Sequence, residues 1–207
     1  GYLGINKKWG FSHLVFSSFN QQTGLIEGER DVATGKFLLY SGTIRERVAT
    51  PEDLASRQPK IPLQHIEHYK IASDNNITVG KSRVKVNLGY QHNIRKEYGN
   101  PEQEKETALY FDLKTITYNV QWILPEKKEW HLTLGSNGMY QQNENKGEEA
   151  IIPNYHFVDA GTFLYAQRYF KQITLSGGVR FDNRTIRSLQ MDEGNTIRFE
   201  KFNKSFS

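Results

Sequence analysis

Apolar and polar residues alternate along one long stretch of the chain, from Ser82 to Gly99. Successive side chains of a β-strand point to opposite faces, so this alternation predicts a strand with one apolar and one polar face. The apolar set is Val84, Val86, Leu88, Tyr90, His92 and Ile94, and the polar set is Lys85, Asn87, Gly89, Gln91, Asn93 and Arg95. A strand that crosses a bilayer needs roughly 9–11 residues, and this stretch is long enough. A long strand of a soluble barrel or sandwich has the same alternation, so both interpretations remain open here.

Extended patterns recur through the rest of the chain and predict about eight antiparallel strands. The remaining expected strands cover residues 2–9, 11–21, 61–75, 107–122, 130–140, 157–170 and 173–182. In the segment 107–122 the apolar parity changes near Thr115, which predicts a β-bulge at that point. Residues 23–60 and 183–207 lose the alternation and are expected to be long loops. Within the first loop, Thr50, Pro51 and Asp53 suit the start of one short helix.

The expected connections between these strands are alternately short and long. Transmembrane β-barrels have short turns at one end and longer loops at the other, whereas a soluble sandwich has no reason to keep this asymmetry. Trp9, Trp122 and Trp130 all lie beside short turns, and tryptophan favours the membrane–water interface. The pattern therefore favours an all-β, antiparallel, up-and-down transmembrane β-barrel. We expect about eight of its strands in residues 1–207, as part of a larger barrel.

Composition limits the other classes of protein. The chain of 207 residues has no cysteine, which excludes disulfides and cysteine-based zinc sites. Its formal net charge of +4 is small and dispersed, so nucleic acid is not an expected partner. No apolar run reaches the roughly 18 residues of a transmembrane helix. Aromatic residues make up 13% of the chain, which suits strands and an interfacial girdle.

No catalytic set is visible in the sequence, and we expect neither an enzyme nor a cofactor. His65 and His68 are three residues apart, which places them on opposite faces of a strand, so no metal site is expected. Arg180 and Asp182 share a polar face, where a local ion pair is the favoured interpretation. The acidic residues of the loops have no apolar cover that would raise a pKa and make an acid–base pair.

Several short motifs resemble those of a known family. They are Ile152-Pro153-Asn154-Tyr155, then Asp159-Ala160-Gly161-Thr162-Phe163, then Gly177-Gly178-Val179-Arg180-Phe181-Asp182-Asn183-Arg184, with weaker matches in 62–71, 90–98 and 113–118. In order and spacing, these motifs resemble the barrel portion of TonB-dependent outer-membrane receptors, of the kind abundant in Bacteroidetes. The resemblance extends over essentially the whole chain.

The resemblance implies a bacterial outer-membrane location and a barrel of about 22 strands around a plug domain. Such receptors import scarce nutrients, such as ferric siderophores, cobalamin or glycans, with energy supplied through TonB. The plug domain and the TonB-contacting segment have no counterpart here. We therefore expect an internal piece of the barrel, whose partners would be the rest of the barrel, the plug, outer-membrane lipid and, through the missing N-terminal part, TonB.

Ligand contacts on such a scaffold are expected in the long loops, because loops carry function there. The candidate residues for binding an unidentified nutrient are Phe37, Tyr40, Arg45, Arg47 and Arg57. The alternative function is a self-contained soluble or small outer-membrane β-barrel that binds a small molecule or a protein. Closure of the sheet would separate the two hypotheses, because an open arc exposes two edge strands that another chain must cover.

Overall fold

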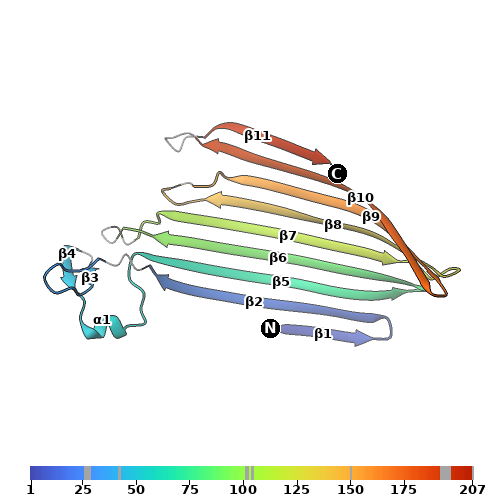
Figure 1. Cartoon of the computed structure of the whole chain (residues 1–207), viewed down its shortest axis with the longest axis horizontal. Helices are drawn as coiled ribbons and strands as arrows, with labels where there is room; N and C mark the ends of the chain where they lie inside the picture. The colour runs from blue at the N-terminus through green and yellow to red at the C-terminus, as the bar shows by residue number, and fades with distance from the viewer. Residues whose placement is uncertain are drawn as a thin grey trace.

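The structure is a computed structural model, and it describes residues 1–25, 29–41, 43–100, 103, 105–149, 151–191 and 197–206. The side chains of these residues are described as well, except in the ranges 40–46 and 189–206. These residues form one nine-stranded sheet and a separate two-stranded hairpin (Figure 1). The strands of the large sheet are β1 (Tyr2–Lys7), β2 (Gly10–Gly24), β5 (Leu63–Val79), β6 (Ser82–Tyr98), β7 (Leu109–Ile123), β8 (Trp130–Asn145), β9 (Tyr155–Phe170), β10 (Ile173–Met191) and β11 (Ile197–Phe206). The hairpin consists of β3 (Leu38–Ser41) and β4 (Thr43–Val48), and one short helix, α1 (Pro51–Ala55), follows it.

The large sheet is an antiparallel meander. Its strand order is β1-β2-β5-β6-β7-β8-β9-β10-β11, so each strand pairs with its neighbour in the chain except where β3, β4 and α1 intervene. The predicted all-β, antiparallel, up-and-down succession is therefore confirmed. The sheet is open rather than closed into a barrel, with β1 and β11 as its two edges (Figure 1).

One face of the sheet carries a continuous apolar belt. Cross-strand partners share a face, so the pairing registers identify the belt directly. The belt consists of Leu14, Phe16, Ile71, Ile77, Val84, Val86, Leu88, Tyr90, Ile116, Tyr118, Val120, Trp122, Leu132, Leu134, Tyr140, Val158, Leu164, Leu175, Val179 and Phe181. We call the side of the sheet that carries these residues the belt face. The other side, which carries Lys85, Asn87, Asn119 and Arg180, is the opposite face.

Within the described ranges, no second layer of protein covers the belt. Leu88 is 50% exposed and Val179 is 70% exposed, although both lie within it. Among the described residues, the only buried apolar side chains are those of Ala49 and Leu109, and no large side chain is fully buried. A soluble sandwich would bury the apolar faces of its sheets against each other. This single sheet has no such core, so its apolar face remains available to another partner.

The connections are segregated by length at the two ends of the sheet. Short turns join β1 to β2, β5 to β6, β7 to β8 and β9 to β10, and all four lie at one end (Figure 1). The other four connections, including the one with β3, β4 and α1, lie at the other end. Three of them are longer than every short turn, but the connection between β10 and β11, residues 192–196, is shorter than the turn between β7 and β8, residues 124–129. The predicted alternation of short and long connections is therefore confirmed from β1 to β10 only.

The predicted helix is also present, as α1. Thr50 is its N-cap and accepts a hydrogen bond from the backbone N–H of Asp53, whose side chain in turn accepts from the backbone N–H of Thr50. This reciprocal pair satisfies donors that the first turn of a helix leaves free. Pro51 occupies the first turn, where its missing N–H costs nothing. Among the described residues, no helix is long and apolar enough to cross a membrane.

The prediction of a long loop from 183 to 207 is wrong. β10 continues to Met191, and Ile197–Phe206 forms β11, which pairs with it. In residues 183–191 polar residues occur at both parities, so the alternation fades while the backbone ladder continues. The first expected loop, 23–60, contains the β3–β4 hairpin in addition to α1.

The predicted β-bulge near Thr115 is also wrong. The pairing of β7 with β6 and with β8 runs without a register shift past Thr115. The parity change has another cause, because the belt ends at Ile116. Leu109, Phe111 and Leu113 lie on the opposite face, toward the end of the sheet with the long connections.

Candidate functional site

The belt ends at a sharp boundary that crosses four strands in register. Tyr90 pairs with Ile116, Ile116 with Tyr140, and Tyr140 with Val158, which makes one apolar row. The next row on the same face, toward the long connections, is polar. It consists of His92, Lys114, Gln142 and His156. A cluster of charged side chains begins at this polar row, and it is the most connected polar arrangement on the belt face.

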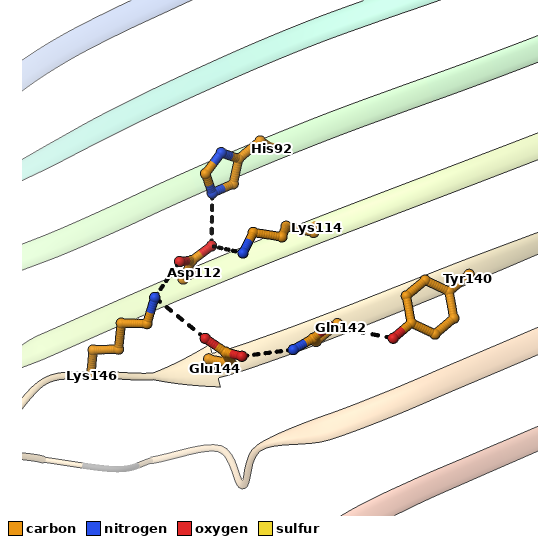
Figure 2. Close-up of polar contacts among 7 residues, drawn as sticks. All are labelled: His92, Asp112, Lys114, Tyr140, Gln142, Glu144 and Lys146. Atoms are coloured by element: carbon orange, nitrogen blue, oxygen red, sulfur yellow. Dashed lines mark hydrogen bonds and ion pairs between the residues drawn. The ribbon is translucent and has the colours of Figure 1, made fainter.

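Asp112 is the centre of this cluster (Figure 2). Its carboxylate is nearly buried, with 7% of the side chain exposed. One oxygen lies 2.7 Å from Nε2 of His92 and 3.8 Å from Nζ of Lys114, and the other accepts a 2.5 Å hydrogen bond from Nζ of Lys146. Lys146 also pairs with Glu144 at 3.3 Å. The contacts join β6, β7 and the end of β8.

The network continues along β8 to β9. Gln142 donates to Glu144 at 2.7 Å and accepts from the hydroxyl of Tyr140 at 3.3 Å. The same hydroxyl lies 3.1 Å from Nδ1 of His156 on β9. Four neighbouring strands are therefore joined by side chains just beyond the belt.

Both oxygens of Asp112 are engaged by cationic or imidazole groups, which hold the carboxylate in place between the strands. Among the described residues there is no group of three His, Cys, Asp or Glu side chains that could hold a metal ion. The arrangement fixes the register of β6, β7 and β8 where the belt ends.

A hollow of about 690 Å³ opens beside the cluster, over β8, β9 and β10. Val158 and Tyr140 give it an apolar side, and His156, Asn154 and Thr185 give it a polar side. It lies on the belt face at the boundary between the apolar and polar rows.

The loop residues predicted to bind a ligand are only partly brought together. Arg47 and Phe37 both lie at the base of the β3–β4 excursion, since the N–H of Ala49 donates to the carbonyl of Phe37. The guanidinium of Arg30, which the sequence did not single out, lies 3.9 Å from the centre of the Phe37 ring. This cation–π contact is the one feature of the predicted set that a planar or cationic ligand could extend.

Arg47 has a structural partner. Its guanidinium donates two hydrogen bonds to Asp53, at 2.6 and 2.8 Å, and so ties the end of β4 to the first turn of α1. These hydrogen bonds, with those from Thr50, lower the pKa of Asp53 well below its ordinary value of 3.8. A ligand that used Arg47 would have to share it with Asp53.

Of the other three candidates, only Arg57 has a described side chain. Arg57 is exposed beyond α1, and within the part of the chain that the structure describes no ion pair or hydrogen bond links it to Phe37 or Arg47. Tyr40 lies in β3 and Arg45 in β4, and their side chains are outside the described residues. The ligand site expected in this loop therefore remains a prediction.

The opposite face carries ion pairs of its own. Arg180 and Asp182 form two hydrogen bonds, one of them at 2.6 Å, which confirms the predicted local ion pair. Arg184 pairs with Asp159 across β10 and β9 at 3.1 Å. His65 and His68 point to opposite faces of β5, as their spacing predicted.

Comparison with protein-family models, with curated proteins and with solved structures finds no match to this chain.

The cluster around Asp112 was only partly visible in the sequence. Asp112 and Lys114 are two residues apart and could be seen as a pair. His92 and Lys146 are 20 and 34 residues from Asp112, so only the pairing registers bring them close. The alignment of His92 with Lys114 depends on the register of β6 with β7, which the connection of residues 99–108 does not fix in the sequence.

Proposed function

We propose that this sheet is a section of a transmembrane β-barrel, with the belt in contact with lipid and the opposite face toward a wet interior. The single observation that carries the proposal is the uncovered apolar belt, continuous from β2 to β10. Exposed apolar patches on soluble monomers rarely exceed a few hundred Å². Outer-membrane barrels have an outward apolar band flanked by aromatic residues and a polar inner face, as this sheet would.

Two further features support this assignment. Trp9, Trp122 and Trp130 are each between 39% and 47% exposed and lie at or near the short turns, where an interfacial girdle is expected. On the opposite face, several buried polar atoms have no protein partner among the described residues, as in His68, Asn137 and Asn143. Water in a barrel interior would satisfy such groups.

The open edges of the sheet lead to the proposed partners. An edge strand presents unpaired N–H and C=O groups, and in a bilayer these cannot be left unsatisfied. We propose that further strands of the same barrel cover β1 and β11, and that a plug domain contacts the opposite face. A self-contained small barrel is less well supported, because the nine strands form an open sheet.

The resemblance to TonB-dependent receptors gives the proposed role: uptake of a scarce nutrient across a bacterial outer membrane, without enzymatic chemistry. The long connections, with Phe37 and Arg30, would meet the nutrient first. The test is to delete the encoding gene and to supply iron chelates, cobalamin or single glycans as the limiting nutrient. We expect loss of growth on one of them, matched by loss of TonB and restored by the intact gene. Normal uptake of every such nutrient would contradict the receptor role.

A further inference from the structure

The two ends of the sheet differ strongly in charge. The short-turn rim, which we define as residues 7–10, 80–83, 124–130 and 170–173, contains seven basic and two acidic residues. The basic residues are Lys7, Lys8, Lys81, Arg83, Lys127, Lys128 and Lys171. The four connections at the other end, residues 25–62, 99–108, 146–154 and 192–196, contain eight basic and thirteen acidic residues. The excess of five positive charges on the rim is larger than the net charge of +4 of the whole chain.

Each short turn contributes to this charge, so the cations follow the whole rim from β1 to β10 and do not form one local cluster. Lys7 and Lys8 belong to the first turn, Lys81 to the second, and Lys171 to the fourth. All seven basic side chains are exposed. The rim is fully described, and none of the ion pairs found there neutralises a lysine, since Glu126 pairs with His131.

The rim is continuous with the belt on the side where the tryptophans lie. Trp9 is in the first turn, Trp130 begins β8, and Trp122 pairs with Val84 beside Arg83. Arg168, one residue row inside the rim, lies between two aromatic rings, 5.5 Å from the centre of Trp130 and 4.5 Å from that of Phe170. The sheet therefore has an apolar belt, then aromatic residues, then unpaired cations. This is the order of the layers of a bilayer, which are the acyl chains, the interface and the headgroups.

We propose that the short-turn rim binds the headgroups of anionic phospholipids in the leaflet that it meets. This inference depends on the membrane location proposed above and adds a lipid specificity to it. Charge complementarity decides the occupant: seven exposed cations favour a phosphate headgroup with net negative charge over a zwitterionic one. Lysine near an anionic membrane surface raises affinity by up to about fivefold for each charge.

The three tryptophans of the chain are built-in reporters for this rim, because Trp9 and Trp130 lie in it and Trp122 lies two residues from it. The chain is reconstituted in vesicles, and its fluorescence is quenched with brominated phosphatidylglycerol or brominated phosphatidylcholine. We expect several-fold preferential quenching by the anionic lipid at low salt and near-equal quenching in 1 M salt, where the Debye length falls to about 3 Å.

Two matched variants separate rim charge from total charge. The rim variant carries Lys8→Gln, Lys81→Gln, Lys127→Gln and Lys171→Gln. The control variant carries four equivalent changes toward the other end, Lys36→Gln, Lys60→Gln, Lys96→Gln and Lys105→Gln. We expect the rim variant to lose the preference for phosphatidylglycerol and the control to keep it.

The outcomes distinguish the two proposals. Equal quenching by both lipids at low salt would overturn the headgroup inference and leave the membrane location intact. An equal loss of preference in both variants would also overturn it, because total charge would then be the cause. Absence of quenching by either lipid would refute the membrane location itself, and the rim inference with it.

Discussion

Tyr90 and His92 lie one pleat apart on the same face of β6, and the edge of the apolar belt passes between them. Tyr90 pairs with Ile116, and His92 pairs with Lys114. The side chain of His92 contacts the nearly buried Asp112, whereas Tyr90 remains 39% exposed. Among the described residues, the structure thus changes within two residues from a face with no protein cover to a face held by charged contacts, which is where we propose that the lipid-facing band ends.

The belt predicts that a charged side chain destabilises the protein far more on one face of β6 than on the other. Leu88→Arg places a charge within the belt, and Asn87→Arg places it on the opposite face one residue away. We expect Leu88→Arg to lower the free energy of unfolding from vesicles by about 2–4 kcal/mol, the cost of arginine near the middle of a bilayer. Asn87→Arg should cost much less, because that face is proposed to be wet. Denaturant unfolding in lipid measures both, and equal costs would contradict the assignment of faces.

The cluster at the belt edge predicts a stability effect centred on Asp112. Asp112→Asn keeps the shape of the side chain but removes the charge that Lys146 and His92 contact. We expect a loss of about 1–3 kcal/mol, as for hydrogen bonds to charged groups. Lys114→Gln should have little effect, because Lys114 lies 3.8 Å from the carboxylate and is 41% exposed. If Lys114→Gln were the more damaging change, the role given to Asp112 would be wrong.

The contact between Arg47 and Asp53 predicts a pH dependence in the loop excursion. The pKa of Asp53 is lower in the folded loop than in the unfolded chain, so its contribution to stability is present above pH 4 and decreases as the pH falls below that value. The protection factors of the amides of residues 47–56, which are corrected for the intrinsic pH dependence of exchange, should therefore fall below pH 4, while those of β6 stay unchanged. In Asp53→Asn the protection factors of residues 47–56 should already be low at pH 7. Protection factors in the parent chain that do not change between pH 7 and pH 3 would contradict this coupling.

Two glycines, Gly135 in β8 and Gly177 in β10, offer a packing test. Gly135 and Phe163 are cross-strand partners, and a Cβ at Gly135 would lie 2.2 Å from the Phe163 ring. Gly135→Ala should displace that ring and cost about 1–3 kcal/mol. Gly177→Ala is the matched control, since a Cβ there meets nothing within 4 Å. Phe163→Leu should recover part of the loss at Gly135, which a general effect of alanine would not explain.

The sequence was sufficient for the strands that cross the belt. Strict alternation in β6 located its faces, and short turns fixed the succession of strands. It is not sufficient where the belt ends. In β11 and the last part of β10 apolar and polar residues occupy both parities, so the sequence predicts a loop. In β7 the apolar residues change face at Ile116, and a change of parity alone cannot be distinguished from a bulge.

The candidate site was harder to predict, because its contacts join residues distant in the chain. Asp112 meets Lys146 only through the register of β7 with β8. In the loop, Arg47 was chosen for its charge, but its partner Asp53 was predicted only as a helix cap. Charge alone does not show whether an arginine is held by the protein or available to a ligand.

The most direct test of the central claim is a spin-label scan along β6. The chain has no cysteine, so single cysteines at positions 83–91 can each carry a label in the vesicle-reconstituted chain. We expect oxygen, which concentrates in lipid, to reach labels at 84, 86, 88 and 90, and a water-soluble nickel complex to reach labels at 83, 85, 87, 89 and 91. Accessibility to the nickel complex at all nine positions, without a period of two, would contradict contact between this face and lipid.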